Sequence, residues 1–362
     1  MPPLLGPDEL AAIVSLREFE APGRARMLGP AWDYVAGGSW DEVTLAENEA
    51  AWRELRFVPR VLTDIRQVEV AGSFLGRTSA LPIAIAPMAV MAMAHPDGEG
   101  AVARAAAAGR IPYVASTSAS SSIEEVAAAA PDADLLFQLY LTRDLEYTRS
   151  LVERAAAAGC LAIVLTVDLP VLGYRERDRR SGFALPAMPN VEPAAGAARG
   201  RYAGLEDQRS IGLTWDDLAT IRSWSSLPLV LKGIVAPKDA RLAVEHGVDG
   251  ICVSNHGARQ LDRTIATAHA LPAVVEAVDG RAEVWVDGGI RRGLDVAAAI
   301  ALGATGVLVG RPFYWALAAG GQPGVERAIA ILQEELELTL PLLGCASVGD
   351  LSASLLAPRR PR

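Results

Sequence analysis

The chain of 362 residues is acidic, with a formal net charge of −9; 51% of its residues are hydrophobic and 21% are charged. This composition is that of a globular protein with ample core, and the acidity argues against a nucleic-acid surface, which needs a basic stripe. The three cysteines, Cys160, Cys252 and Cys345, stand far apart and predict buried thiols rather than a disulfide framework. The first residues lack a basic start followed by an apolar run, and no uncharged apolar stretch reaches about 18 residues, so we expect a cytoplasmic protein without a membrane partner.

Residues 1–80 form a segment of their own in front of the rest of the chain. Helical patterning covers residues 8–19 and again residues 44–55. Between these stretches, two glycines break a helical pattern beside Tyr34, which on local grounds predicts a packing residue. Residues 68–78 alternate weakly around two glycines and predict a hairpin that caps another element.

From residue 81 the sequence alternates between short apolar strands and alanine-rich helices. Eight such units with unbroken apolar strands favour a parallel sheet closed into a (β/α)8 (TIM) barrel over residues 81–340, with residues 1–362 as a single domain. An open, doubly wound sheet would need a glycine-rich fingerprint after the first strand, where Pro87, Met88 and Ala89 stand instead. The predicted strands are 83–87, 112–116, 135–140, 161–168, 229–233, 250–254, 284–287 and 306–310. The predicted helices begin near Asp97, Ser121, Arg143, Pro237, Ala266, Gly293 and Pro312.

The connection between residues 168 and 229 is too long for a barrel of this kind. Compact domains rarely keep such loops unless the loop serves a site. Residues 176–210 are rich in Gly, Ala and Pro, and we expect them to form a mobile lid over the barrel mouth. A linker between two domains is the alternative.

The stretch 253–262 (VSNHGARQLD) directly follows the sixth strand and carries His256 and Arg259. Histidine exchanges a proton near neutral pH, and arginine offers a planar fork that matches a carboxylate. The chain contains only four histidines, so a His-Gly-x-Arg turn at a strand end is distinctive. Asp168, at the end of the fourth strand, could hold the second ring nitrogen of His256 and raise its basicity. The pattern predicts a base and a carboxylate clamp; a solvated loop is the alternative.

Other polar residues end strands at the same mouth, where the active sites of such barrels lie. Glycine-rich turns at 287–293 and 306–312, with Arg291 and Arg311, predict a phosphate site, although plain tight turns would look similar. Lys232 could form a Schiff base, balance an anion or stabilise a reduced flavin. Arg175 lies in a charged run that also fits a solvated surface. No His, Cys and Asp cluster has metal-ligand spacing, so no metal is expected. The strand-end set is Ala89, Ser116, Gln138, Tyr140, Thr166, Asp168, Lys232, His256, Arg259, Asp287 and Arg311.

Together these motifs resemble those of the FMN-dependent α-hydroxy-acid oxidases and dehydrogenases, the family of glycolate oxidase, lactate oxidase and mandelate dehydrogenase. The resemblance runs from about residue 8 to about residue 350, and its most specific motif is Ser254 to Asp262. Supporting matches lie at 94–96, 137–140, 165–168, 231–233, 287–289 and 310–312.

The resemblance implies FMN as cofactor and oxidation of an L-2-hydroxy acid to the 2-oxo acid. His256 would be the base, paired with Asp168, while two arginines bind the substrate carboxylate and two tyrosines its other oxygens. It stays open whether His256 takes the α-proton, giving a carbanion, or the hydroxyl proton as hydride leaves. The catalytic and substrate-binding residues implied are Tyr34, Tyr140, Asp168, Arg175, His256 and Arg259. Those implied for the cofactor are Pro87, Met88 and Ala89 at the ring, Ser116, Gln138, Thr166 and Lys232 at its polar edge, and Ser254, Asp287, Gly288, Gly289, Arg291, Gly310 and Arg311 at the ribityl phosphate.

Three positions depart from the family pattern. Ser118 stands where the oxidases often carry a tryptophan that faces the substrate, Met88 replaces a threonine of glycolate oxidase, and Val35 replaces a second tyrosine. Loss of the indole enlarges the pocket and predicts a substrate larger than glycolate, such as an aryl or branched 2-hydroxy acid. Ala89 resembles the oxidases, which favours O2 as electron acceptor and H2O2 as product. A dehydrogenase with another acceptor is the alternative.

Other functions are compatible with parts of the same pattern. A biosynthetic flavin oxidase acting on a larger, amino-acid-derived or carrier-bound hydroxy acid would keep every motif. Flavin-dependent isopentenyl-diphosphate isomerases lack the His-Gly-x-Arg pair, and a non-catalytic scaffold would need Lys232, Asp168, His256 and Arg259 to be present by accident. The resemblance also implies a homotetramer.

Overall fold

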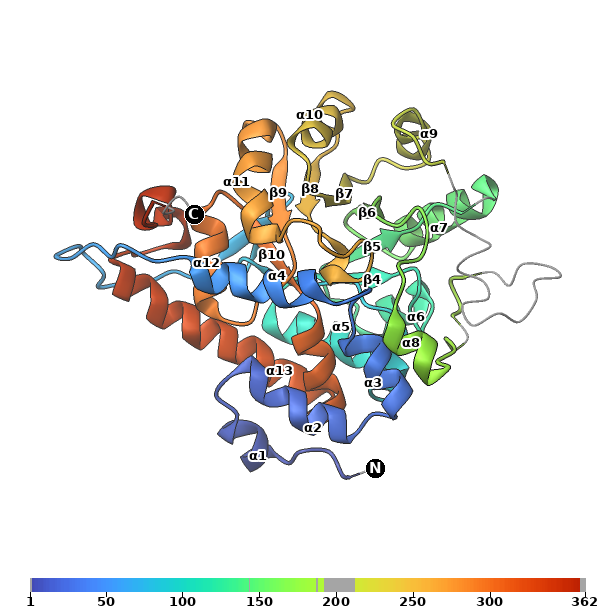
Figure 1. The fold of residues 1–362 in the computed structure, drawn as a ribbon, viewed down its shortest axis with the longest axis horizontal. Helices are drawn as coiled ribbons and strands as arrows, with labels where there is room; N and C mark the ends of the chain where they lie inside the picture. The colour runs from blue at the N-terminus through green and yellow to red at the C-terminus, as the bar shows by residue number, and fades with distance from the viewer. Residues whose placement is uncertain (1, 143, 187, 192–211, 359–362) are drawn as a thin grey trace.

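The computed structural model describes residues 2–142, 144–186, 188–191 and 212–358 (Figure 1). Within these residues, eight parallel strands close into a barrel in the order β10-β3-β4-β5-β6-β7-β8-β9. Each observed strand lies within its predicted range or one residue beyond it, so the predicted (β/α)8 architecture is confirmed. The strands are β3 Ile83–Ile85, β4 Tyr113–Ser116, β5 Leu135–Leu139, β6 Ile163–Thr166, β7 Leu229–Ile234, β8 Gly250–Val253, β9 Glu283–Val286 and β10 Gly306–Val309.

The outer helices begin close to the predicted starts. Ser122 caps α6 with its side chain and pairs with Glu125 in a capping box, and Asp144 caps α7. Arg143, the predicted start of α7, lies outside the described residues. The helices that alternate with the strands are α5 Gly98–Gly109, α6 Ile123–Ala129, α7 Leu145–Ala157, α10 Pro237–Glu245, α11 Thr267–Val278, α12 Gly293–Ala301 and α13 Arg311–Leu343.

The N-terminal segment is helical but differs from the prediction over residues 8–19. The chain forms two short helices there, because Ile13 and Ser15 take extended conformations. The carboxylate of Glu18 accepts hydrogen bonds from the backbone N–H of Val14 and from the hydroxyl of Ser15, which starts a new turn. The helices of this segment are α1 Pro7–Ala12, η1 Leu16–Phe19, α2 Glu20–Ala25, α3 Gly29–Ala36 and α4 Val43–Glu54.

The predicted hairpin is present and closes the amino-terminal end of the barrel. Strands β1 Gly72–Phe74 and β2 Arg77–Ser79 pair antiparallel. Phe74 meets Trp285 edge to face, with ring centroids 5.3 Å apart. A Cβ on Gly306 would approach the Phe74 ring to 2.6 Å, so only glycine fits there.

Side chains fill the barrel interior. One apolar cluster takes residues from all eight strands together with Phe74, and a larger cluster packs the outer strand faces against the helices. Cys252 belongs to the inner cluster, and all three cysteines are free and buried, as expected. Because the hairpin closes the amino-terminal end of the barrel and side chains pack its interior, a ligand can enter at the carboxyl-terminal mouth.

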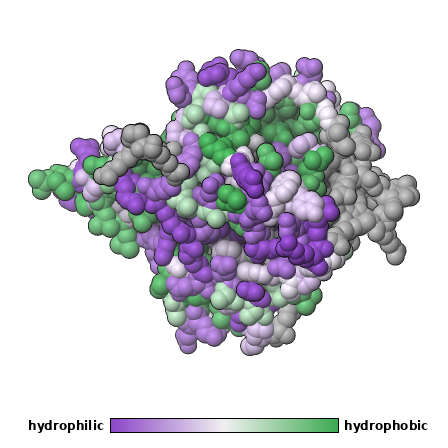
Figure 2. All heavy atoms as spheres, viewed as in Figure 1, coloured by the Kyte–Doolittle hydropathy of each residue, from purple (hydrophilic) through white to green (hydrophobic). Residues whose placement is uncertain are grey.

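Only parts of the predicted lid, residues 176–210, are described. Residues Glu176–Ser181 form helix α8, which packs on α3, and Phe183 and Met188 are buried. Residues 187 and 192–211 lie outside the described residues. Beyond them, α9 Asp217–Ser223 leads into β7, and an apolar recess lies beside β7 on the face shown in Figure 2.

Candidate active site

An open cavity with an empty volume of about 1100 Å³ lies at the carboxyl ends of the strands. This volume includes space open to solvent, and the polar residues at the strand ends around it are typical of a small-molecule site. Of the predicted site residues, Asp168 and Ser254 are off its wall. The others line it: Tyr34, Pro87, Met88, Ala89, Ser116, Gln138, Tyr140, Thr166, Arg175, Lys232, His256, Arg259, Asp287, Gly288, Gly289, Arg291, Gly310 and Arg311.

His256, on this wall, pairs with Asp168, which lies behind it. The Nδ1 atom of His256 lies 2.7 Å from Oδ1 of Asp168, which leaves Nε2 for the cavity. His256 has φ 57, in the left-handed region, within a turn that the Asn255 side chain caps by accepting the N–H of Ala258. Burial lowers the pKa of His256 despite the opposing effect of Asp168, so the imidazole is neutral at neutral pH. A neutral imidazole held by a carboxylate is suited to accept a proton.

Lys232, at the end of β7, is a fixed cation. Its Nζ lies 2.9 Å from both Oδ2 of Asp287 and Oγ of Ser254. Burial disfavours the ammonium, but Asp287 and Asp168 outweigh burial and hold the pKa of Lys232 above its ordinary value. A protonated amine cannot attack a carbonyl, so the Schiff-base alternative is disfavoured and a charge-stabilising role is favoured.

Ser254 lies between Lys232 and His256. Its hydroxyl lies between Lys232 Nζ and the backbone N–H of His256, which donates to it at 3.0 Å. It therefore links the cation to the base, and its role at the ribityl phosphate stays a prediction.

Two arginines surround Tyr34 at the mouth. The guanidinium of Arg259 lies 4.7 Å from the Tyr34 ring centroid and donates to the carbonyl oxygen of Gly37 at 3.2 Å. Arg175 lies 5.8 Å from the same ring and donates to the carbonyl of Arg259 at 3.2 Å. Arg175 is 6% exposed, which excludes the solvated-surface alternative. Tyr34 also stacks on Phe183, with centroids 4.6 Å apart, so two cations beside the base are held rigidly.

A ladder of buried polar side chains crosses three adjacent strands. Ser116 Oγ donates to Gln138 Oε1 at 3.1 Å, and Gln138 Nε2 donates to Thr166 Oγ1 at 3.1 Å. The strand pairing places these residues side by side, since Ser116 faces Gln138 in the β4–β5 register. Such a row offers donors and acceptors to the polar edge of a flat ring.

The glycine-rich corner is braced by α4. A Cβ on Gly289, at φ +83, would come within 2.1 Å of the carbonyl oxygen of Asn48, so the turn requires glycine. Asn48 exchanges two amide hydrogen bonds with Asn255, at 2.9 and 2.8 Å, and Trp52 Nε1 donates to the Gly288 carbonyl at 2.8 Å. The N-terminal segment therefore fixes this corner of the cavity.

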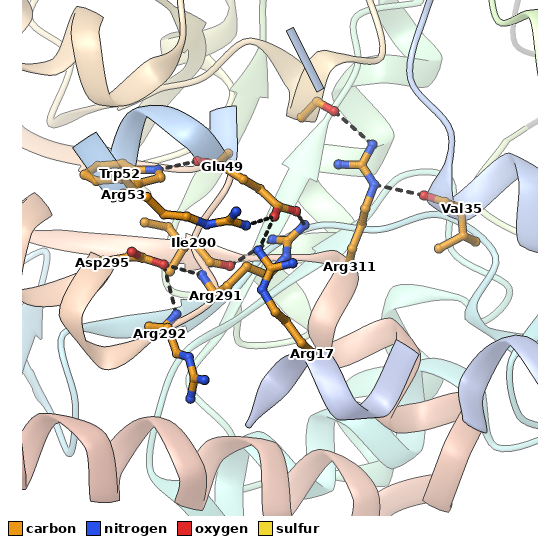
Figure 3. A network of polar contacts seen from close by, with 12 residues as sticks. Arg17, Val35, Glu49, Trp52, Arg53, Ile290, Arg291, Arg292, Asp295 and Arg311 are labelled. Carbon is orange, nitrogen blue, oxygen red and sulfur yellow. Dashed lines mark hydrogen bonds and ion pairs between the residues drawn. The ribbon is translucent and has the colours of Figure 1, made fainter. Parts of the chain in front are cut away.

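Arg291, which is buried, and Arg311, which is partly buried, complete the corner (Figure 3). Arg311 donates to the carbonyls of Val35, Gly37 and Gly257 at 3.1, 2.9 and 2.9 Å. Burial, with the repulsion of Arg259 and Arg291, lowers the pKa of Arg311 to about 9. Neutral carbonyls leave its charge uncompensated, so an anion bound here would be stabilised.

Sequence reasoning missed several wall residues. Leu169 and Leu172 follow the fourth barrel strand, and Tyr314 stands in the first turn of α13, where its hydroxyl donates to the carbonyl of Val90 at 2.8 Å. Their proximity to Asp168 and Arg311 in the sequence was a usable signal. Ser118, noted for its departure from the family pattern, does line the cavity.

This fold and this site define a flavin-dependent oxidoreductase that acts on a small acid. The family model for FMN-dependent dehydrogenase matches residues 23–358. The chain is 46% identical to an L-lactate oxidase of Nostoc sp. over 96% of this chain and 99% of that protein. It is 45% identical to a 4-hydroxymandelate oxidase of Amycolatopsis orientalis, over 93% of this chain and 96% of that protein. A structure of mandelate oxidase with (S)-4-hydroxymandelic acid superposes with a TM-score of 0.89 at 44% identity, covering 95% of this chain and 98% of that one. The chain belongs to the FMN-dependent α-hydroxy-acid oxidase family and oxidises 2-hydroxy acids.

FMN is the cofactor of this family, and the cavity fits it. Two buried atoms, Nε of Arg291 and Oδ1 of Asp287, have no hydrogen-bond partner within the described ranges. Because buried polar atoms are normally paired, this fits a site in which a bound ligand supplies the partners. The polar ladder and Lys232 suit the edge of the flavin ring, and the Gly288–Gly289 corner with Arg311 suits a phosphate. Across the described chain no group of His, Cys, Asp and Glu could hold a metal ion, and no helix there is long and apolar enough to cross a membrane.

Proposed function

We propose that the protein oxidises an L-2-hydroxy acid larger than glycolate, with an aryl or branched side chain. The observation that carries this proposal is Ser118 on the cavity wall, where the family's oxidases often have a tryptophan. Leu169, Leu172 and Met88 add apolar wall that would cover an apolar side chain. The similarity to 4-hydroxymandelate oxidase supports an aryl substrate, whereas the similarity to L-lactate oxidase is equally high.

In this proposal the residues of the mouth bind and orient the acid. Arg259 and Arg175 bind its carboxylate, and Tyr34 and Tyr140 contact its other oxygens. Bound in this way, the reacting end of the substrate lies against Nε2 of His256. FMN, when bound, supplies the acceptor for the two electrons that leave the substrate.

His256 takes the proton at Nε2, whether the proton leaves the α-carbon or the hydroxyl group. Asp168 stabilises the imidazolium that forms, because its carboxylate stays on Nδ1. Lys232 is placed to balance negative charge that develops at the polar edge of the cavity.

We further propose that O2 is the electron acceptor and that H2O2 is released. The support is Ala89 beside the ring-facing wall, as in the oxidases. The resemblance also leads us to propose a cytoplasmic homotetramer, which sedimentation of the purified protein and fractionation of cells would check.

The test is to mix the purified holoprotein anaerobically with a panel of 2-hydroxy acids and follow the flavin absorbance. Bleaching by mandelate or a branched 2-hydroxy acid that is faster than by glycolate, followed by rapid recovery in air with H2O2, is expected. Faster bleaching by glycolate would refute the substrate proposal, and slow recovery in air would indicate a dehydrogenase. If no member bleaches the flavin, the substrate is of another kind, such as a larger biosynthetic hydroxy acid.

A second test addresses the base. His256→Ala should retain FMN while substrate no longer reduces it. Reduction at the rate of the unmodified protein would refute the role of His256.

A further inference from the structure

Glu49, on the α4 helix that braces the glycine-rich corner, is surrounded by three guanidinium groups (Figure 3). Its Oε1 lies 2.9 Å from Nη2 of Arg291. Its Oε2 pairs with Arg17 of η1 and, at 2.8 Å, with Arg53 one turn along α4. Glu49 itself does not line the cavity, so any effect on a ligand acts through Arg291.

Arg291 reaches both Glu49 and the cavity. Its side chain is 8% exposed and lines the cavity beside Gly289 and Ile290. Its buried Nε has no hydrogen-bond partner among the described residues, which leaves one N–H of the guanidinium unpaired in a residue that lines the cavity. Glu49 is the carboxylate that pairs with Nη2 of the same guanidinium.

Three contacts besides Glu49 fix the position of Arg291. Its Nη1 donates to the carbonyl of Ile290 at 2.9 Å, its guanidinium lies 5.2 Å from the ring centroid of Trp315, and its backbone N–H donates to Asp295 at 2.8 Å. The orientation of the guanidinium is therefore over-determined. Removal of the Glu49 charge would change the electrostatics of the corner more than its geometry.

We propose that Glu49 is an internal counter-anion of Arg291. Glu49 compensates the positive charge of Arg291 when the corner holds no phosphate, and it lowers the affinity of the corner for the phosphate of FMN. A buried cation without a counter-ion is costly, and Glu49 removes that cost in the flavin-free protein. When the phosphate binds, the same carboxylate repels it across Arg291. Glu49 therefore acts through the charge of Arg291 and sets how strongly the protein prefers FMN to riboflavin, which lacks the phosphate.

The alternative is that Glu49 mainly orients Arg291, in which case its removal would weaken phosphate binding. One hydrogen bond contributes less free energy than the interaction of a unit charge with a nearby phosphate dianion at an effective dielectric constant of about 20. The charge effect therefore outweighs the loss of orientation.

The experiment compares Glu49→Gln with the unmodified protein and with Glu47→Gln. Glu47 is exposed on the same helix, so its variant removes the same charge from a site away from Arg291. The full chain is stripped of flavin and titrated separately with FMN and with riboflavin, and flavin fluorescence gives the two dissociation constants. Their ratio, riboflavin over FMN, measures the contribution of the phosphate alone.

We expect Glu49→Gln to raise this ratio by roughly tenfold or more, while Glu47→Gln leaves it unchanged. A general loosening of the corner would weaken both ligands and leave the ratio constant. A ratio that is unchanged, or that falls, in Glu49→Gln would overturn the proposal.

A second measurement covers the case in which flavin-free Glu49→Gln does not fold. Loss of FMN from the holoprotein after dilution should then be slower in Glu49→Gln than in the unmodified protein. Faster loss would overturn the proposal. Neither measurement uses a substrate, so the result is independent of which 2-hydroxy acid the enzyme oxidises.

Discussion

Replacement of Asp168 by asparagine tests the pair at the centre of the site. Asparagine keeps the size of the side chain and an oxygen near Nδ1 of His256, but it removes the negative charge. The His256–Asp168 pair is enclosed, with the two side chains 16% and 13% exposed, so solvent screens it poorly. Loss of this charge destabilises the protonated form of His256, which forms only as the substrate is oxidised.

The size of the effect follows from the geometry. The interacting nitrogen and oxygen atoms are 2.7 Å apart, which places the centres of charge about 4 Å apart. Opposite unit charges at that distance attract by about 4 kcal/mol at an effective dielectric of about 20. Since about 1.4 kcal/mol corresponds to a tenfold change in rate, flavin reduction should slow by about a thousandfold.

The assay is anaerobic stopped-flow reduction of the bound flavin at saturating substrate, which isolates the proton-transfer step from reoxidation. Asp41→Asn, at an exposed ion pair with Arg263, is the matched control and should reduce at the normal rate. Retained FMN and an unchanged melting temperature would show that Asp168→Asn is folded. Reduction within tenfold of the unmodified rate would refute the reasoning, because the carboxylate would not then stabilise protonated His256.

Three further predictions follow from the same geometry. Burial lowers the pKa of His256 below 6.5, so the base is neutral above that pH. The rate of flavin reduction should therefore be constant through neutral pH and fall only in acid. A rate that still rises above about pH 7 would contradict this. Gly233 has φ +115, and a Cβ there would lie 2.6 Å from the Asp168 side chain, so Gly233→Ala should lower the free energy of unfolding in urea by about 1–3 kcal/mol and slow flavin reduction. Gly247 has φ +71 but open space around its Cβ position, so Gly247→Ala should lower the stability less and leave flavin reduction intact. Equal behaviour of the two variants would show that the clash with Asp168 has no effect. Ser118→Trp should reduce kcat/KM for an aryl 2-hydroxy acid far more than for lactate, and equal losses would show that Ser118 does not set the size of the pocket.

The barrel was predictable because its signals are local. Each strand is a short apolar run, every strand but the first ends at or near a polar or glycine residue, and the closed parallel arrangement then brings the strand ends together. His256, Lys232 and Gln138 could be placed on one mouth for this reason alone. The single long helix expected at residues 8–19 failed because a side-chain contact, from Glu18 back to Ser15, outweighs the helical pattern.

Contacts between distant segments were not predictable. Nothing near Glu49 in the sequence indicates that it pairs with Arg291, and nothing near Ser254 indicates that its hydroxyl lies 2.9 Å from Nζ of Lys232. Ser254 follows a strand whose neighbour β7 has an irregular register between Lys232 and Ile234, and such a shift changes which side chains face the cavity.

The N-terminal segment must be part of the active site rather than an appendage to the barrel. Arg311 and Arg259 donate to carbonyl oxygens of residues 34–37, so without this segment Arg259 would lose both of these acceptors and Arg311 would keep only the carbonyl of Gly257. Asn48 closes on Gly289 so tightly that the glycine turn and α4 fix each other's position. The closed barrel supplies the base, the fixed cation and the polar ladder, but the groups that hold anions depend on a segment outside it. Folding of α3, α4 and the turn between them onto the mouth is therefore a condition for holding either the phosphate or the substrate carboxylate.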